Sequence, residues 1–567
     1  MAQYEVVYSD VLIVGGGISG MTAAIKMKDL NPKLDVLVID KGIVGWAGQI
    51  PVSGGHVMTV FPGDDPSRFE EFAIREGKYL NNQHWTRKFL DNVGPSVRQT
   101  VDWGFPYFRG DDGDIIKMKK HDFYNITMCN PKPFMVKLRK IGELKGVRTM
   151  DRVPSLELIQ AGDRVAGVMG YGMDDQKIYA FMAKEVVLAS GSCRYKRMKT
   201  FTMNSGEGVG MAYEAGAELM NAEFSNSYGF VLKDYEANNR DAWYYYFVNA
   251  KGERIMEKHH PDMMEAIRAG GENQDFSKVV GAMGKEALAG NGPIYLDLTG
   301  VPDEEYNKYI KPEPLDLPFY QDPRKVIKLK GNADIRNGKY EMIPAFVAGQ
   351  GPIRVDTDGH TTVPGLWAVG DVCSLGSGWF GARPSSACPG LGFPFAMTTG
   401  FIVAQGLVNR YGNVDHPAES TLSLGARADQ ILKPMQKDSG RDVFEAMYRI
   451  HEAVVPMKYN FFRNEEGLNE ALDIVEDAAG MLAESKPENP HDLEKYYEVK
   501  GMIVNAKLTL TAAKTRKESR GVHRRLDYPE QNDAKFRKWI VQKKEGDQHI
   551  VRLDPVPLEN YPYQPAE

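Results

Sequence analysis

Short runs of apolar residues alternate with helix-compatible segments over the first 40 positions of the chain. Asp10–Val14 is an apolar run that stops at three glycines, which is typical of a strand buried on both faces. Met21–Leu30 consists of helix-compatible residues and is stopped by Asn31 and Pro32. A second apolar run, Asp35–Ile39, is closed by Asp40. This order predicts that the chain opens with a βαβ unit.

Similar apolar runs return in two later parts of the chain. Residues 162–190 are rich in strand formers, have turns at 161–163 and 174–175, and end in the buried run Glu185–Ser190. Another buried run, Gly365–Gly370, follows much later. We interpret it as a return to the kind of structure that opens the chain.

Three other stretches differ from this pattern. Residues 65–104 are charged and helical in pattern, whereas residues 225–343 are polar and aromatic without a clear parallel strand, which indicates an inserted domain. Residues 420–515 are almost continuously helical in composition. The last 45 residues are basic and then rich in proline and tyrosine, so we expect a tail that wraps around the rest of the molecule.

Composition and charge exclude several classes of protein. Of the 567 residues, 42% are apolar, which suffices for a large core in several folding units and argues against global disorder. Lysine and arginine number 70 against 76 acidic residues, a net charge of −6 that argues against nucleic-acid binding. None of the four cysteines lies in a C-x-x-C pair, so we expect no metal site. No apolar run reaches about 18 residues and the N-terminus lacks a basic leader, so we expect a cytoplasmic chain that is not an integral membrane protein.

A glycine-rich turn between the first predicted strand and helix carries the strongest chemical signal. Gly15, Gly17 and Gly20 fit the G-x-G-x-x-G pattern. Such glycines permit a tight turn, the approach of a pyrophosphate and close packing of the helix, whose N-terminus faces the phosphates. Asp40 lies 20 residues after Gly20, where an acid holds a ribose hydroxyl. We therefore predict dinucleotide binding, the alternative being a purely structural turn.

Two further features favour FAD over NAD as the dinucleotide. The loop Lys41–Gly55 comes directly after the acid, and its glycines and serines suit a segment that runs along a flavin. Far downstream, a predicted strand ends at Gly370 and is followed by Asp371, an acid placed to hold a ribitol hydroxyl. The alternative for Asp371 is an ordinary turn or helix-capping residue.

Five segments together resemble the flavoprotein subunits of the succinate dehydrogenase and fumarate reductase family, which also contains aspartate oxidase and the α subunit of adenylylsulfate reductase. The resemblance covers essentially the whole chain, and its C-terminal motif is rarely seen elsewhere. The segments are Gly15–Gly20 with Asp40; Val187–Gly191; Asn204–Gly208 with Ala215–Ala217 and Glu223–Phe224; Val363–Asp371; and Lys517–His523 with Asp527–Pro529.

The resemblance implies an α/β fold. In that fold a Rossmann-like FAD-binding domain is interrupted by an α+β capping domain and followed by a helical domain and a C-terminal tail. On this sequence the FAD-binding domain takes residues 1–225 and 344–415, the capping domain 226–343, the helical domain 416–520 and the tail 521–567. Pro389–Pro394 predicts a loop into a helix over Phe395–Val408, whose N-terminus in this family points at the flavin.

The resemblance also implies FAD as the cofactor. Some members attach FAD to a histidine in the loop after the second strand, but the corresponding place here is near Gly48, so we predict non-covalent FAD. The alternative attachment point is the nearby His56. The expected cofactor-binding residues are Gly15, Gly17, Ile18, Ser19, Gly20, Asp40, Lys41, Gly48, Gln49, Ser53, Gly54, Gly55, Ala189, Ser190, Gly191, Asn204, Glu207, Gly370, Asp371, Leu391 and Gly392.

The expected substrate site departs from that of the dicarboxylate-using members. Tyr228 and Val347 stand near the places of two carboxylate-binding histidines, whereas Arg383 keeps the arginine that follows the ribitol acid. A dicarboxylate needs several fixed donors for its two charges. Succinate and fumarate are therefore not expected as substrates.

Arg383, Arg268 and Tyr228 are the candidate catalytic residues. Arg383 offers a forked, charged donor for a carboxylate, sulfate or phosphate beside the flavin, and the alternative is that it packs against the FAD diphosphate or an acid of the cap. Arg268 falls near the place of a proton-donating arginine of fumarate reductases, although the local sequence does not match.

Two further groups of residues have both a functional and a structural interpretation. The aromatic residues of Trp379–Phe380 and Trp243–Phe247 suit either an aromatic-lined substrate pocket or plain core. Cys373 and Cys388 are either a redox pair or small buried residues.

These features predict an FAD-dependent oxidoreductase that exchanges a hydride with a small anionic or aromatic substrate. Because the chain has no cluster motif and no second nucleotide motif, the resemblance implies an iron–sulfur, ferredoxin-like partner subunit for the electrons. Two alternatives stay open. One is an adenylylsulfate reductase α-like subunit, and the other is a non-catalytic electron-transfer flavoprotein, which would explain the missing histidines.

Overall fold

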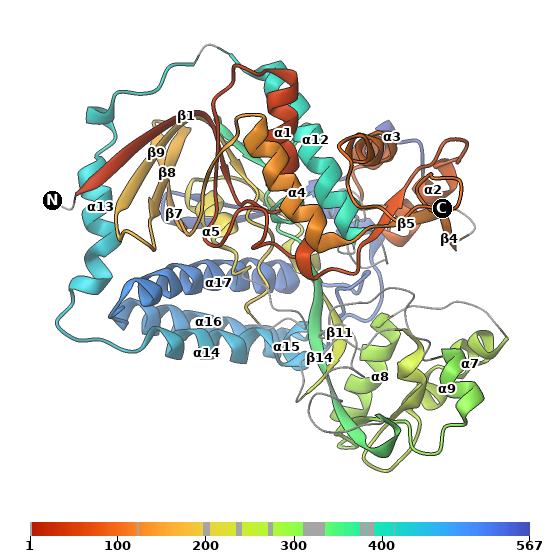
Figure 1. The fold of residues 1–567 in the computed structure, drawn as a ribbon. Coiled ribbons are helices and arrows are strands. Elements are labelled where there is room, and N and C mark those ends of the chain that lie inside the picture. The colour runs from red at the N-terminus through yellow and green to blue at the C-terminus, as the bar shows by residue number, and fades with distance from the viewer. Residues whose placement is uncertain are drawn as a thin grey trace. The chain divides into compact units, whose positions relative to one another are not determined.

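The chain divides into two compact units (Figure 1). The first unit comprises Met1–Lys196, Thr202–Ser225 and Gly349–Glu567, and the second comprises Arg197–Phe201 and Asn226–Ala348. The structure is a computed structural model, and it describes residues 3–121, 124–196, 204–233, 241–269, 276–309, 335–374, 381–382, 391–412 and 414–566.

A twisted seven-stranded sheet forms the centre of the first unit, in the order β6-β2-β1-β9-β8-β7 with β15 paired to β9. β1, β2, β6, β9 and β15 are parallel to one another, whereas β8 is antiparallel to both β9 and β7 at the edge of the sheet. The strands are β1 (Tyr4–Val14), β2 (Val36–Ile39), β6 (Arg148–Met150), β7 (Ser155–Ala161), β8 (Arg164–Tyr171), β9 (Ile178–Leu188) and β15 (Leu366–Ala368). The βαβ opening and the two later strand predictions are confirmed.

Strand β1 is longer than predicted, because its first residues pair with β9 from Tyr4↔Ile178 onward. Its second half is completely apolar and buried from Val11 to Val14, as expected for a strand covered on both faces. Helices α1 (Ile18–Leu30), α4 (Pro131–Leu144) and α12 (Gly392–Arg410) pack side by side (Figure 1). The helix predicted over Phe395–Val408 is α12.

A small antiparallel sheet and two helices complete this part of the unit. The sheet has the order β3-β5-β4, and its middle strand joins the other two. Asn82 caps the longer helix by accepting a hydrogen bond from the backbone N–H of Trp85. The elements are β3 (His56–Thr59), β4 (Met118–His121), β5 (Tyr124–Met128), α2 (Ser67–Glu76) and α3 (Gln83–Asp102).

The helical region predicted near the C-terminus is confirmed and belongs to the same compact unit as the sheet. Its longer helices begin at capping residues, since the side chains of Asp442, Asn464 and Asn489 each accept a backbone hydrogen bond. α17 packs on α5 so closely that a Cβ on Gly501 would lie 2.9 Å from the nitrogen of Glu207. The helices are α5 (Glu207–Glu214), α13 (Leu424–Leu432), α14 (Val443–Val454), α15 (Met457–Asn460), α16 (Glu465–Glu484) and α17 (Pro490–Thr515).

The last 45 residues are more regular than the wrapping tail that the sequence predicted. They contain the short helix α18 (Asp533–Phe536) and a β-hairpin of β16 (Lys538–Glu545) and β17 (Gln548–Pro555). β16 also pairs with β10 (Leu219–Met220). Gly546 makes the turn with a φ of +58°, and Trp539 to Val541 are buried, so glycine between two β-forming runs was the sequence signal for the hairpin.

The second unit contains a four-stranded sheet of order β11-β14-β13-β12. Helix α8 packs against β11 and β13, and Phe230, Tyr244 and Phe247 form an aromatic core. The elements are β11 (Asn226–Leu232), β12 (Phe247–Val248), β13 (Ile294–Asp297), β14 (Lys339–Gly349), α6 (Ile255–His259), α7 (Pro261–Arg268), α8 (Phe276–Leu288) and α9 (Asp303–Tyr309).

The two ends of the inserted unit meet on the first unit. Ser225 precedes the insertion and Gln350 follows it, and the backbone N–H of Gln350 donates a hydrogen bond of 2.9 Å to the carbonyl oxygen of Ser225. Residues 226–348 therefore leave and re-enter the first unit at a single place, while the second unit also takes the short segment Arg197–Phe201.

Candidate functional site

The glycine turn between β1 and α1 has the geometry that its sequence predicted. Gly15 has a φ of +112°, and its N–H donates to the carbonyl of Ile39 on β2. A Cβ on Gly20 would lie 2.0 Å from the carbonyl oxygen of Gly15, so only glycine permits α1 to pack on the turn. Gly17, in contrast, has no atom of the described residues within 4 Å of the position of a Cβ. The turn is therefore tightly packed at Gly20, whereas the space beside Gly17 is open.

Asp40 holds this turn against the end of β2. Its carboxylate accepts hydrogen bonds of 2.7 Å from the N–H groups of Gly16 and Gly42. Burial raises the pKa of Asp40, while these two backbone donors work in the opposite direction. Each carboxylate oxygen retains capacity for another donor, so the predicted contact with a ribose hydroxyl stays compatible with this arrangement.

The loop that follows Asp40 lies over the glycine turn. Gly45 donates its N–H to the carbonyl of Gly16, and a Cβ on Gly48 would lie 3.3 Å from the Cα of Gly17. Further on, the hydroxyl of Ser53 is buried and has no hydrogen-bond partner in the described structure. Gly55, with a φ of +69°, leads into β3 and pairs with Cys129.

Arg194 is a buried residue of the site that the sequence reasoning missed. It is 2% exposed, donates a hydrogen bond of 2.6 Å to the side-chain oxygen of Gln49, and lies 3.5 Å from the carboxylate of Asp371. Burial lowers the pKa of Arg194 to about 10. In the sequence it comes three residues after Gly191, behind the small residues Ser192 and Cys193. It connects two predicted cofactor residues that are far apart in the chain.

Asp371 follows the end of β15 in the short turn Gly370–Val372. Gly370 is essential to this turn because its φ is +71° and a Cβ would lie 2.5 Å from the hydroxyl of Ser19. Burial raises the pKa of Asp371 to about 6, although Arg194 works in the opposite direction. Its Oδ1 atom is buried without a hydrogen-bond partner among the described residues. The described residues thus leave one oxygen of this acid without a hydrogen-bond donor.

Ser190 and Asn204 line the segment that follows β9. The hydroxyl of Ser190 is buried and, in the described part of the chain, has no hydrogen-bond partner. A Cβ on Gly191 would lie 2.3 Å from the side-chain nitrogen of Asn204, so these two residues are packed together. The backbone of Asn204 accepts the N–H of Arg194 at 3.3 Å.

Lys41 lies in a half-buried cluster of charges around the buried Glu498. Its ammonium group contacts the carboxylates of Glu207 at 2.5 Å and Glu498 at 2.8 Å, and donates to the hydroxyl of Ser205. Burial lowers the pKa of Lys41, but the two carboxylates outweigh that effect and raise it. Lys196 also contacts Glu498, and burial lowers its pKa to about 8. The predicted cofactor residues Lys41 and Glu207 are therefore ion-pair partners of each other.

The N-termini of α1, which begins after Gly17, and of α12, which begins after Leu391, have no side-chain cap in the described structure and no acidic residue in the first turn. They share this with other helices of the unit, such as α4 and α13. An uncapped helix N-terminus offers free N–H groups and a partial positive charge to an anion.

The donors and acceptors of this site fit FAD. A diphosphate suits the open space at Gly17 and the N-terminus of α1, while hydroxyl groups suit the orphaned oxygens of Ser53, Ser190 and Asp371. The backbone contacts of Ala189 to Val14 and of Val369 to Leu188 bring the remaining predicted segments to the same edge of the sheet.

The candidate catalytic residues fall in three different places. Arg383, Trp379–Phe380 and Cys388 lie outside the described residues. Tyr228 is part of β11 in the second unit, and its side chain and that of Val347 also lie outside the described part of the structure. Arg268 ends α7 in the same unit, where its side chain is 59% exposed and pairs with Glu257.

The aromatic run of the second unit contributes to its core. Tyr244 and Tyr246 are each 1% exposed, so this part of Trp243–Phe247 is core rather than the lining of an open pocket. Cys373 is buried, and because Cys388 lies outside the described residues, the redox pair and the structural interpretation both stay open.

Comparisons with known proteins now identify the chain. Residues 10–388 match the family described as FAD binding domain, and residues 452–567 match the family described as Fumarate reductase flavoprotein C-term. The chain is therefore a flavoenzyme that uses FAD. It belongs to the succinate dehydrogenase and fumarate reductase flavoprotein family of FAD-dependent oxidoreductases, and the predicted family, fold class and cofactor are confirmed.

Three known proteins are similar to this chain in sequence or in fold. The chain is 25% identical to a fumarate reductase (CoM/CoB) subunit of Methanothermobacter marburgensis, over 97% of this chain and 100% of that protein. The flavoprotein FrdA of E. coli quinol fumarate reductase shares its fold with a TM-score of 0.84 at 20% identity, over 99% of each chain. Adenylylsulfate reductase of Archaeoglobus fulgidus gives a TM-score of 0.77 at 20% identity, over 98% of this chain and 97% of that one.

Among the described helices, none is both long enough and apolar enough to cross a membrane.

Proposed function

We propose that this flavoenzyme exchanges a hydride between FAD and a small anionic or aromatic substrate, and passes the electrons to or from an iron–sulfur, ferredoxin-like subunit. The observation that carries the proposal is the set of three buried oxygens, on Ser53, Ser190 and Asp371, that have no partner among the described residues and accompany the open glycine turn. Such oxygens are costly to bury unless a ligand supplies their hydrogen bonds. FAD supplies the hydride chemistry when it is bound.

In this proposal the residues of the first unit bind and orient the cofactor. Gly17 and the N-terminus of α1 take the diphosphate, Asp40 takes the ribose, and Asp371 takes a ribitol hydroxyl. Arg194 keeps Asp371 ionised at neutral pH and fixes Gln49, so that both side chains keep one position. His56 is the first residue of β3 and pairs with Met128 of β5. We propose that FAD is bound without a covalent link to this histidine.

Arg383 is the proposed anion-binding residue at the substrate side. Arg268 and Tyr228 belong to the inserted unit, which we assign as the cap, and they stay candidate catalytic residues. Tyr228 and Val347 replace the two histidines expected for a dicarboxylate. Fumarate must nevertheless be tested first, because a relative is named as a fumarate reductase. We expect fumarate to be a poor oxidant of the reduced enzyme.

The test is a two-part measurement on the purified protein. Acid precipitation should release yellow FAD into the supernatant, and colour in the pellet would contradict non-covalent binding. The reduced protein is then mixed with fumarate, adenylylsulfate and a series of enoates, and flavin reoxidation is followed. The Arg383→Ala variant should retain FAD and lose turnover. Loss of FAD would instead indicate that Arg383 binds the cofactor.

A second candidate function is an adenylylsulfate reductase α-like activity. The replaced histidines favour it, because that reaction needs no dicarboxylate site. Faster reoxidation by adenylylsulfate than by any enoate would support this candidate over the first. A protein that is reduced by a ferredoxin and responds to no small molecule would instead be an electron-transfer subunit.

A further inference from the structure

Three chain segments meet at Ala382, the residue directly before the proposed anion-binding Arg383. The backbone N–H of Ala382 donates to the carbonyl of Gly77 at 3.0 Å, and its carbonyl accepts the N–H of Val522 at 3.1 Å. Both backbone groups of Ala382 are thereby fixed, one by the segment after α2 and the other by the C-terminal region.

Glycines make this junction tight. A Cβ on Gly521 would lie 2.1 Å from the carbonyl oxygen of Ala382, and Gly521 has a φ of +58°. A Cβ on Gly381 would lie 2.2 Å from the carbonyl oxygen of Gly77. On the opposite side, Lys78 and Tyr79 adopt left-handed conformations with φ of 55° and 57°. Residues other than glycine adopt this conformation only where their surroundings impose it.

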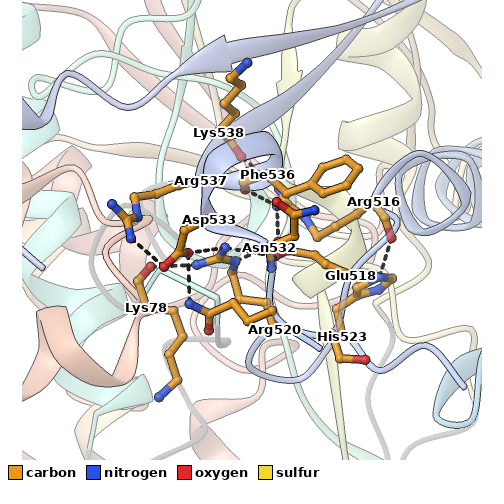
Figure 2. Close-up of polar contacts among 12 residues, drawn as sticks. Lys78, Arg516, Glu518, Arg520, His523, Asn532, Asp533, Phe536, Arg537 and Lys538 are labelled. Carbon is orange, nitrogen blue, oxygen red and sulfur yellow. Dashed lines mark hydrogen bonds and ion pairs between the residues drawn. The ribbon is translucent and has the colours of Figure 1, made fainter. Parts of the chain in front are cut away.

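A buried ion network holds the C-terminal side of the junction (Figure 2). We call Arg516, Glu518 and Arg520 the tail network; their side chains are fully buried. Glu518 accepts from Arg516 at 3.0 Å, twice from Arg520 at 2.7 and 2.9 Å, and from the N–H of Asn532 at 2.8 Å. All four acceptor positions of this carboxylate are therefore used.

Arg520 extends the tail network to the junction itself. Its Nη1 donates to the carbonyl of Lys78 at 3.2 Å, and its Nη2 donates to Asp533 at 2.6 Å. Only one residue, Gly521, separates Arg520 from Val522, which binds Ala382. The same guanidinium thus holds the left-handed segment at Lys78 and the turn that docks on Ala382.

Arg516 connects the tail network to a second segment of interest. Its Nε donates to the carboxylate of Glu223 at 2.7 Å, and both groups are completely buried. Glu223 lies two residues before Ser225, where the chain leaves for the inserted unit. The network therefore binds segments on the amino-terminal side of both Arg383 and Tyr228.

We propose that the tail network is a positioning element: it fixes Ala382, the residue that directly precedes the proposed anion-binding Arg383 in the sequence. This inference rests on the proposed role of Arg383. A fully buried charge cluster is a poor source of stability compared with apolar packing, whereas its fork-like bonds fix directions closely. Positioning therefore explains why ionic groups occupy this place. Arg516, Glu518 and Arg520 act through Ala382.

The test compares Glu518→Gln with a matched acid-to-amide change in the same tail. Asp527→Asn removes the charge that binds the buried Arg525 at 2.8 and 2.7 Å, and within the described structure Asp527 makes no hydrogen bond to residues 77–79 or 381–382. Hydrogen exchange of the Ala382 and Val522 amides is measured on the FAD-loaded full chain. We expect at least about tenfold faster exchange at both amides in Glu518→Gln and no change in Asp527→Asn. Unchanged exchange in Glu518→Gln would overturn the proposal.

The second readout is anion affinity, with sulfite as the probe and the flavin absorbance as the signal. We expect the Kd for sulfite to rise about tenfold or more in Glu518→Gln, with FAD content unchanged, and to stay constant in Asp527→Asn. A purely structural network would lower the melting temperature and leave this Kd unchanged, which would refute the proposal. Loss of FAD in parallel with sulfite binding would refute it too.

Two further variants keep the test decisive. If Glu518→Gln does not fold, Arg520→Lys retains the charge, removes the fork, and must give the same two changes. If Arg383→Ala leaves sulfite affinity unchanged, the proposed function of Arg383 is refuted. The hydrogen exchange of the Ala382 amide still tests the tail network independently.

Discussion

Replacing Asp371 by asparagine should raise the stability of the apoprotein and lower its affinity for FAD. The carboxyl group is buried, and its pKa of about 6 lies well above its ordinary value of 3.8. Ionisation is therefore less favourable in the folded apoprotein than in the unfolded chain. The stability of the apoprotein falls as pH rises from about 3.8 to about 6, and is constant above that window.

The magnitude follows from the same two values. At about 1.4 kcal/mol per pH unit, the interval from 3.8 to 6 corresponds to about 3 kcal/mol of lost stability at neutral pH. An asparagine resembles the protonated acid in shape and carries no charge. The Asp371→Asn apoprotein should thus be more stable than the wild type by up to about 3 kcal/mol near pH 8, and about equally stable near pH 4.

FAD binding should respond in the other sense. A hydrogen bond to a charged acceptor contributes about 1.5–3 kcal/mol, so its replacement by a neutral acceptor should raise the Kd for FAD about 10- to 100-fold. Urea midpoints of the apoproteins by tryptophan fluorescence give the first quantity, and fluorescence titration with FAD gives the second. Asp174→Asn, at a site that is 70% exposed, is the control and should change neither.

One result would refute this reasoning. If the Asp371→Asn apoprotein is less stable than the wild type at pH 8, the ionised carboxylate stabilises the empty fold, and the acid has a structural role of its own. An unchanged Kd for FAD would show that the orphaned Oδ1 atom does not receive a cofactor hydroxyl.

Other substitutions test separate parts of the site. Gly20→Ala places a Cβ 2.0 Å from the carbonyl oxygen of Gly15, so the purified variant should contain almost no flavin by absorbance; a normal flavin content would contradict the close packing of α1. Glu498→Gln leaves Lys41 and Lys196 without a shared buried counter-charge, so the urea midpoint should fall by the equivalent of about 3–5 kcal/mol, and an unchanged midpoint would show that the cluster is solvated. His56→Ala should release the same FAD into acid supernatant as the wild type does, and a difference between them would indicate a covalent link.

Local patterns in the sequence were sufficient to predict the sheet and its glycine turn. A buried parallel strand is apolar along its whole length, as Val11–Val14 shows, and the strand after it needs an acid at its end for the turn to close. These are short-range requirements, so they are visible in a few consecutive residues. The position of Asp371 after Gly370 was predictable for the same reason.

Other features depend on residues that are distant in sequence. The position of Lys41 directly after Asp40 predicts a cofactor-binding residue. Its ion-pair partners Glu207 and Glu498 lie 166 and 457 positions away in the sequence, so the local pattern does not show them. Arg194 was missed because nothing local shows that Gln49 and Asp371 converge on it. The C-terminal hairpin was missed because a composition rich in proline and tyrosine is typical of an irregular tail, and the one glycine at position 546 is a weak signal against it.

The hydrogen bond between Gln350 and Ser225 has an evolutionary consequence. Because both ends of the inserted unit meet on the first unit, residues 226–348 form a closed excursion whose length does not strain the host fold. Mutation and recombination can enlarge, shorten or replace this excursion while the glycine turn and its acid stay intact. The host unit can therefore keep its fold while the length and sequence of residues 226–348 change.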